Sequence, residues 1–252
     1  MIDRKTFDNL WKEHEASQHA DEYFYYLDFL SNYLERNKAE NPLVVEIGIR
    51  FGQQSWHYIE HLNADYIGMD IRPKDYSIPN AVIEGYDDKV NLHPKAQFLL
   101  GNSQLPETKK KLEEILNGRQ IDVLFIDADH RYASAKKEWE LYSPLVKNIV
   151  AFHDVNIMGS NNNSKFWEEL VRKEKVPCVE FKGRGVLEVY PEFKSIKGTP
   201  KYYLSSPGIG CVLMNELREK PKVRKIFLDK FQFDKMRNQN DNYKLWEGEV
   251  EK

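Results

Sequence analysis

The sequence predicts an α/β protein with a doubly wound, mainly parallel sheet of seven strands, the last of which runs antiparallel. Two observations support this prediction. Between residues 43 and 173, short apolar runs alternate with stretches of helical periodicity, which is typical of right-handed β–α–β units. After residue 175, two more apolar runs follow with no helical stretch between them, and this indicates an antiparallel edge on the same sheet.

Each expected element follows from its local pattern. Short apolar runs bounded by turn residues predict strands, and the expected strands are 43–47, 66–70, 97–100, 123–127, 149–153, 179–181 and 210–214. Apolar residues spaced three and four apart predict helices, which we expect over 5–37, 53–62, 107–116, 132–145 and 165–173. The polar segment from residue 216 is expected to form a helix with a frayed end.

Length and composition exclude several classes of protein. A chain of 252 residues with 41% hydrophobic and 31% charged residues is sufficient for one globular domain with a full core. Its net charge of −3 provides no overall basic field, so neither nucleic acid nor an anionic membrane is the expected partner. The sequence gives no signal for an oligomeric state.

The cysteines and the apolar runs bear on location. Cys178 and Cys211 lie in separate apolar runs, so we expect buried free thiols rather than a disulfide. No apolar stretch reaches the ~18 residues of a membrane span, and residues 1–6 lack the apolar core of a signal peptide. A cytoplasmic location is therefore expected.

The first candidate ligand-binding feature is the turn after the strand at 43–47. Glu46 is followed there by Gly48 and Gly52. Ser55, at the start of the next helix, is a further candidate for binding a cofactor. Glycines allow a sharp turn and close approach to a ligand. The spacing differs from the Gly-x-Gly-x-x-Gly of NAD-binding proteins, and a carboxylate such as that of Glu46 repels a pyrophosphate. The turn therefore disfavours a nicotinamide cofactor.

Polar residues also follow the next two strands. Asp70 ends the strand at 66–70, where an acid can accept hydrogen bonds from ribose hydroxyls; a helix cap is the alternative. Asn102 and Ser103 follow the strand at 97–100 and can face an adenine ring, although Ser103 is also a candidate helix N-cap.

The fourth and fifth strands end in acidic and histidine residues. Asp127, His130, His153 and Asp154 lie at the carboxyl ends of strands that are expected to be neighbours, which is where open α/β sheets bind ligands. Two carboxylates with nearby oxygen or imidazole ligands can hold Mg²⁺ or Mn²⁺, and His130 can act as a base near neutral pH. Alternatively, Asp127 only orients a substrate or caps a helix.

Together these motifs resemble those of class I S-adenosylmethionine-dependent methyltransferases, which have a Rossmann-like fold. The motifs are Glu46-Ile-Gly-x-x-x-Gly, Asp70, Phe-Ile-Asp-Ala-Asp-His at 125–130 and Phe-His-Asp-Val at 152–155. More narrowly, they resemble the small O-methyltransferase group that includes macrolide-sugar methyltransferases and cephalosporin-hydroxylase-like proteins. The resemblance extends from about His19 to Glu168, with a weaker match at 207–214.

The resemblance implies how the site would work. S-adenosylmethionine would be bound by Glu46, Gly48, Gly52, Ser55, Asp70, Asn102, Ser103 and Asp127. A divalent metal, Mg²⁺ or Mn²⁺, would be held by Asp127, His153 and Asp154, with His130 as the base that removes a proton from a small, hydroxylated, sugar-like acceptor. This chain departs from the group at His153, where the group has an acid, and the departure puts the metal in doubt.

Three further expectations follow. We expect an N-terminal helical cap over residues 1–40, a methyltransferase domain over 41–215 and a C-terminal helical tail over 216–252. The segment 17–19 resembles a family segment that folds over the cofactor and acceptor, so the aromatic residues 23–26 either line such a lid or belong to the core. A metal-independent methyltransferase acting on oxygen or nitrogen, and a non-catalytic cofactor-binding protein, are the alternative functions.

Overall fold

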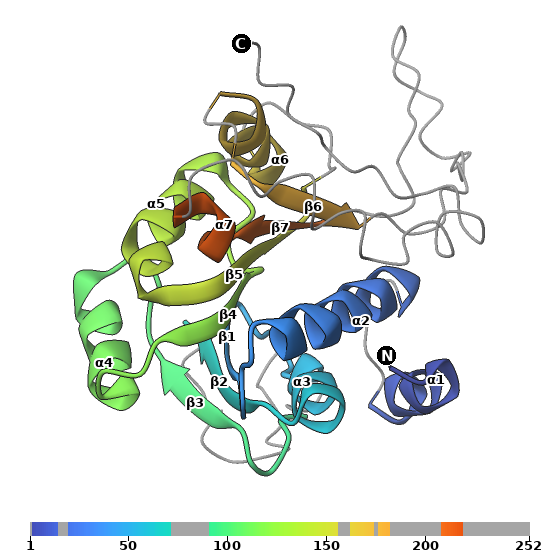
Figure 1. The fold of residues 1–252 in the computed structure, drawn as a ribbon. Coiled ribbons are helices and arrows are strands. Elements are labelled where there is room, and N and C mark those ends of the chain that lie inside the picture. The colour runs from blue at the N-terminus through green and yellow to red at the C-terminus, as the bar shows by residue number, and fades with distance from the viewer. Residues whose placement is uncertain are drawn as a thin grey trace, which may run out of the picture.

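The fold has three layers, with a central sheet between two sets of helices (Figure 1). The computed structural model describes residues 2–14, 20–71, 91–155, 162–173, 176–181 and 208–218, and structural statements below concern these residues. The predicted segment 17–19 and most of the predicted C-terminal tail, 219–252, lie outside them.

The sheet has seven strands in the order β3-β2-β1-β4-β5-β7-β6. The strands are β1 (Leu43–Ile47), β2 (Asp65–Asp70), β3 (Gln97–Leu100), β4 (Ile121–Ile126), β5 (Val146–His153), β6 (Cys178–Phe181) and β7 (Ile209–Leu213). The first five are parallel, and β7 is antiparallel to both β5 and β6. The predicted fold class is therefore confirmed, and β1 lies in the interior of the sheet.

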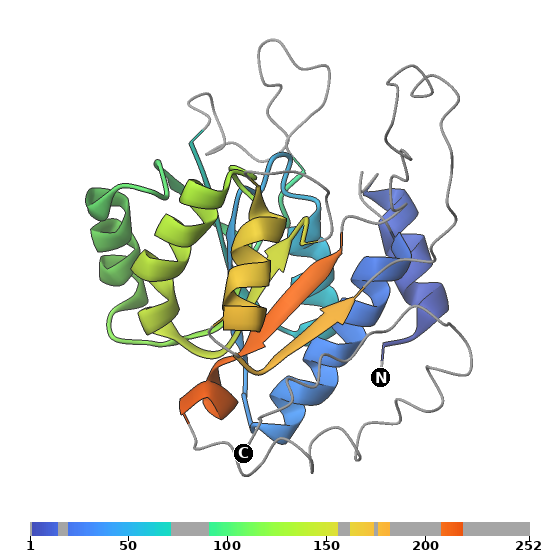
Figure 2. The same ribbon diagram turned by 90° about the horizontal axis from the view of Figure 1, so that it is seen from above.

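Helices cover both faces of the sheet (Figure 2). They are α1 (Arg4–Glu13), α2 (Ala20–Arg36), α3 (Gln54–Leu62), α4 (Pro106–Leu116), α5 (Tyr132–Tyr142), α6 (Asn163–Glu168) and α7 (Met214–Arg218), with a 3₁₀ turn at 143–145 and a π turn at 169–173. Buried residues of α1, α2 and α3 form one core cluster with one face of the sheet, and those of α4, α5 and α6 form another with the opposite face. Alternate residues of β1 divide between these clusters, which explains why β1 is apolar along most of its length.

The single helix predicted over 5–37 is wrong, because the structure contains two helices there. The first, α1, ends at Glu13, and His14 caps it by donating its backbone N–H to the carbonyl oxygen of Leu10. Neither proline nor glycine marks this end, so the continuing apolar pattern concealed it.

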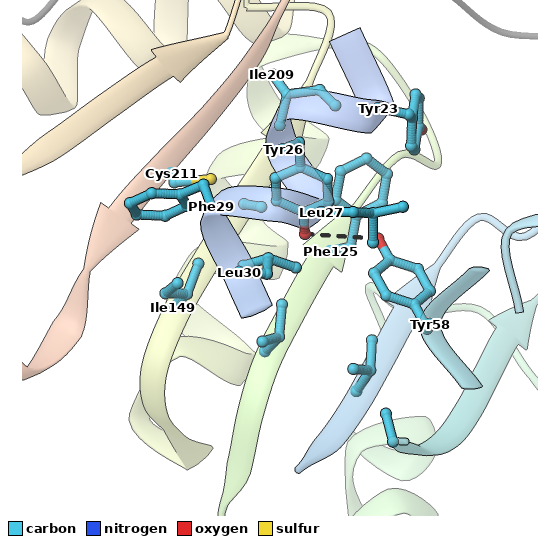
Figure 3. Close-up of a cluster of buried hydrophobic side chains, with 14 of the residues drawn as sticks. Tyr23, Tyr26, Leu27, Phe29, Leu30, Tyr58, Phe125, Ile149, Ile209 and Cys211 are labelled. Atoms are coloured by element: carbon cyan, nitrogen blue, oxygen red, sulfur yellow. Dashed lines mark hydrogen bonds between the residues drawn. The ribbon is translucent and has the colours of Figure 1, made fainter. Parts of the chain in front are cut away.

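The aromatic residues at the start of α2 belong to the core. Tyr23 and Tyr26 are fully buried, and the Tyr58 hydroxyl donates a hydrogen bond of 3.5 Å to the Tyr26 hydroxyl (Figure 3). Phe125 of β4 packs against the rings of both. Of the two interpretations of this aromatic stretch, the structure supports the core.

Both cysteines are buried free thiols, as expected. Cys211 packs in the same cluster as Tyr26 (Figure 3). No helix among the described residues is long and apolar enough to cross a membrane.

Candidate active site

The turn between β1 and α3 brings its backbone against the end of β4. Gly48 has a φ of +89°, and a Cβ atom there would lie 2.4 Å from the Ala128 Cα atom. The Gly48 N–H donates to the Met69 carbonyl oxygen and the Asp127 N–H to that of Ile47, both at 2.8 Å. These contacts join the ends of three strands, and they leave no room for a side chain at Gly48.

Gly52 and Ser55 stabilise this turn through hydrogen bonds. Gly52 has a φ of +80°. The buried Ser55 hydroxyl donates to the Gly52 carbonyl oxygen at 2.6 Å and accepts a bond of 2.8 Å from the His93 N–H. Neither residue lines the cleft described next. These two bonds hold the Ser55 hydroxyl within the turn, and its predicted contact with the cofactor stays a prediction.

A cleft of about 430 Å³ lies at the carboxyl ends of β1 to β4. Several residues predicted from the sequence line it: Gly48, Asp70, Asn102, Ser103, Asp127 and His130. Position and lining both suit a nucleoside ligand, because open α/β sheets bind such ligands at this edge.

Two of the predicted polar residues are held in place by backbone groups. Asp70 Oδ2 accepts a hydrogen bond of 3.0 Å from the Arg50 N–H, and Asn102 Oδ1 accepts one of 2.9 Å from the Gln104 N–H. Arg50 itself has a φ of +52°, a left-handed conformation that is uncommon for a residue with a side chain. Asp70 is thus fixed in the cleft wall at the place expected for a ribose-binding acid.

Ser103 is linked to an acid that sequence reasoning missed. Its hydroxyl donates a bond of 2.5 Å to Glu138 Oε1, whereas the N-cap of α4 is Leu105, so the alternative role of Ser103 as a helix cap is wrong. Burial raises the pKa of Glu138 to about 7. Both residues line the cleft, and its inner wall therefore carries a carboxyl group with an elevated pKa.

A smaller pocket of about 170 Å³ adjoins the cleft. Its lining residues are Glu46, Gly48, Ile49, Arg50, Gln53, Gln54, Asp127, His130 and His153. It shares four lining residues with the larger cleft: Gly48, Arg50, Asp127 and His130. A ligand in either space can therefore contact these four residues.

Glu46 faces this smaller pocket rather than the larger cleft. It is buried and accepts a hydrogen bond of 2.5 Å from the Tyr66 hydroxyl. Burial raises its pKa to about 8. Near neutral pH the group is therefore largely protonated before any ligand binds.

Asp127, His153 and Asp154 form what we call the aspartate–histidine cluster, in which one ligand atom of each residue lies within 4.8 Å of the others. His153 Nδ1 is 3.0 Å from Asp127 Oδ1 and 3.1 Å from Asp154 Oδ1. Two carboxylates and an imidazole are a donor set that divalent metal ions accept. The sequence prediction that these residues come together is confirmed by the geometry.

His130 borders the cluster and both pockets. Its Nδ1 atom contacts Asp154 Oδ2, and its Nε2 atom is 3.9 Å from Asp127 Oδ1. The hydrogen bond with Asp154 raises the pKa of His130. Its side chain is 46% exposed, so it remains accessible to a ligand.

Behind the cluster lies Glu22 of α2, which sequence reasoning did not identify. It is fully buried, and its Oε1 atom is 3.7 Å from His153 Nε2. Burial raises the pKa of Glu22 to about 8. For His153, burial opposes the charged form, but the carboxylate of Asp127, helped by Asp154 and Glu22, raises its pKa to about 9.

Comparison with known proteins shows what this part of the chain is similar to. Residues 45–155 match a family described as a methyltransferase domain. This segment contains the glycine turn, Asp70 and the whole aspartate–histidine cluster. The match covers less than half of the chain, and it supports the class I S-adenosylmethionine-dependent methyltransferase that the sequence motifs predicted. A comparison of the sequence with curated proteins found no match.

Among solved structures, a protein from Klebsiella pneumoniae, provisionally assigned as an O-methyltransferase, shares the fold. The TM-score is 0.51 at 12% identity, over 85% of this chain and 92% of that chain. The MycE methyltransferase of the mycinamycin biosynthetic pathway, solved with Mg and S-adenosylhomocysteine (SAH), aligns with a TM-score of 0.43 at 11% identity, over 82% of this chain and 48% of that chain. A second MycE structure also contains mycinamycin VI. It aligns with a TM-score of 0.40 at 15% identity, over 58% of this chain and 38% of that chain.

Proposed function

We propose that the protein transfers the methyl group of S-adenosylmethionine to a hydroxyl group of a small, hydroxylated, sugar-like acceptor, with the assistance of a divalent metal ion. One observation carries this proposal: Asp127 of the aspartate–histidine cluster and His130 line both the cleft and the smaller pocket, and His153 lines the pocket. A cofactor in the cleft and an acceptor in the pocket would therefore have their reacting atoms next to the same side chains.

In this proposal the residues of the cleft bind the cofactor. Asp70 accepts hydrogen bonds from the ribose, Gly48 lets the backbone approach the ligand, and Asn102 and Ser103 lie near the adenine. Because the sulfonium methyl and the acceptor oxygen must meet in line, positioning is the main contribution of the protein.

The cluster and His130 act on the acceptor. A metal ion held by Asp127, His153 and Asp154 would lower the pKa of the acceptor hydroxyl. Because His130 Nδ1 contacts Asp154, Nε2 is the nitrogen that takes the hydroxyl proton. The oxygen–methyl bond then forms while the sulfur–methyl bond breaks, and sulfur keeps the electron pair, which gives SAH.

Metal-independent transfer is the second candidate, and the contact between His130 and Asp154 favours it. A carboxylate that orients a histidine is sufficient for general-base catalysis without an ion. In that case the remaining residues of the cluster serve only to orient His130 and the acceptor.

Chelation separates the two candidates. Methyl transfer from radiolabelled S-adenosylmethionine to a panel of sugars and other polyhydroxylated acceptors is measured before and after dialysis against EDTA. Metal-assisted transfer predicts loss of activity and recovery when a divalent ion is restored. Full activity after dialysis would show that the cluster residues are not required as metal ligands and would leave the metal-independent reaction.

A further inference from the structure

We propose that the aspartate–histidine cluster prefers a divalent first-row transition ion to Mg²⁺, and that Glu22 is a positioning residue that orients His153 as one of the ligands. This inference rests on the proposed metal-assisted reaction and names the class of ion that the site takes.

The donor set provides the first reason. Magnesium favours oxygen ligands and retains several water molecules. A neutral imidazole nitrogen, by contrast, suits ions such as Fe²⁺, Co²⁺ and Zn²⁺. With two carboxylates and one imidazole within 4.8 Å of one another, the cluster has a mixed set of ligands that favours the transition ions.

The orientation of the His153 ring provides the second reason. Its Nδ1 atom faces both carboxylates, at 3.0 and 3.1 Å, and its Nε2 atom faces Glu22 Oε1 at 3.7 Å. Nδ1 is therefore the nitrogen available to a shared ion. Metal-binding histidines commonly donate their other ring N–H to a carboxylate, which fixes the tautomer and the ring orientation.

Glu22 is well placed to be that carboxylate. It is fully buried, and its Oε1 atom is the carboxyl oxygen that faces Nε2 of His153. Tyr23 and Tyr26, on the same helix, are packed in the core, so α2 holds Glu22 in place. The ring of Tyr23 lies 5.9 Å from that of His153 and forms part of the wall beside it.

The backbone of the cluster is also held before any ligand binds. Asn163 Nδ2 donates to the His153 carbonyl oxygen at 3.2 Å, and the Ser164 hydroxyl donates to that of Asp154 at 2.9 Å. Asp154 has a φ of +60°, a strained conformation for a residue with a side chain. The start of α6 thus fixes the two adjacent ligands, which indicates a site that is largely formed in advance.

Cobalt is a suitable probe, because it reports both affinity and ligand type. Protein freed of metal by dialysis against a chelator is titrated with Co²⁺, alone and in competition with Mg²⁺, and the SAH affinity is measured on the same samples. We expect one Co²⁺ per chain, bound tighter than Mg²⁺ by at least about an order of magnitude. Proton NMR of the Co²⁺-loaded protein should show a strongly shifted, exchangeable imidazole N–H signal.

Substitutions test the two residues separately. His153→Asp should abolish most of the preference for Co²⁺, together with the shifted N–H signal. Glu22→Gln should weaken Co²⁺ binding by about 10- to 100-fold, as expected for loss of a carboxylate behind a ligand, and should speed exchange of that N–H. Glu180→Gln is the matched control, because Glu180 is a buried carboxylate bonded to Trp167 instead.

Several results would overturn the inference. Equal competition by Mg²⁺, an unchanged Co²⁺ preference in folded His153→Asp, or a Co²⁺-loaded wild type without the shifted signal would each contradict the transition-ion site. If Glu22→Gln has the same Co²⁺ affinity and the same N–H exchange rate as Glu180→Gln, Glu22 does not orient His153. Failure of the proposed function would look different: SAH would not bind, or methyl transfer would be indifferent to metal removal.

Discussion

His130 has one ring nitrogen in contact with Asp154 and the other 3.9 Å from Asp127 Oδ1. The sequence already placed His130 three residues after Asp127, because both lie in one short motif. Glu22 and Glu138 could not be found in this way. Each lies on a helix whose buried face is set by tertiary packing, and no local pattern distinguishes them from solvent-exposed acids.

The role of His130 as a base can be tested by His130→Gln. We expect the rate of methyl transfer to fall by about 10²- to 10⁴-fold, the usual contribution of general-base catalysis. Metal should still bind and SAH affinity should remain within a few-fold of wild type, because Asp127, His153 and Asp154 are all retained. Rates are compared at saturating S-adenosylmethionine, and a variant with an unchanged rate would contradict the role.

Asp70 is expected to bind the cofactor rather than to act in the reaction. Asp70→Ala should weaken SAH binding by about 1–3 kcal/mol, because charge-assisted hydrogen bonds to the ribose are lost. Asp129→Ala is the control, because Asp129 lines the same cleft but pairs with Arg131. Calorimetric titration of both variants gives the comparison; an unchanged affinity for folded Asp70→Ala would assign Asp70 a structural role.

Among the elements, the strands were predicted more accurately than the N-terminal helices. Each predicted strand is present, because apolar runs bounded by turns are a local signal. The end of α1 was missed, since the apolar spacing continues across residue 14 and no breaker residue marks it. The packing of α2 against β4 is a contact between segments that are far apart in the chain. The sequence therefore could not decide whether the aromatic residues of α2 line a lid or belong to the core.

Leu27→Ala tests whether α2 is part of the core. Leu27 is fully buried among the aromatic rings of α2 and β4 (Figure 3), so we expect a loss of about 2–5 kcal/mol in the free energy of unfolding. Ile115→Ala, at a helical position that is 43% exposed, should cost much less. Urea unfolding measures both, and equal small losses would support a lid that is only loosely attached.

At the scale of the whole molecule, the sequence predicted the sheet and its antiparallel strand but not the order of the strands. The position of β7 between β5 and β6 depends on pairings between segments that are far apart in the chain, which local patterns do not encode. The same limit applied to the site. The sequence predicted which strand ends carry polar groups. The pocket that these residues line could be identified only once the fold was known.

The buried acids make the stability of the metal-free protein dependent on pH. The pKa values of Glu22 and Glu46 are raised to about 8 and that of His153 to about 9. In each case the folded state binds protons more tightly than the unfolded state. Stability should therefore fall as the pH rises from about 7 toward 9.

Urea unfolding in EDTA at pH 5, 7 and 9 measures this effect. Glu46→Gln keeps an acceptor for the Tyr66 hydroxyl and removes the ionisable group, so it should flatten the fall in stability. The exposed Glu107→Gln is the control and should leave the pH profile unchanged. A wild-type profile that rises between pH 7 and 9 would contradict the inferred protonation of these groups.

The central claim is that the cleft at the ends of β1 to β4 binds S-adenosylmethionine. Isothermal titration of the purified protein with SAH and with NAD tests it most directly. We predict saturable binding of SAH and no measurable binding of NAD, because the glycine spacing of the turn differs from that of NAD-binding proteins. An affinity for NAD equal to or greater than that for SAH would contradict the account.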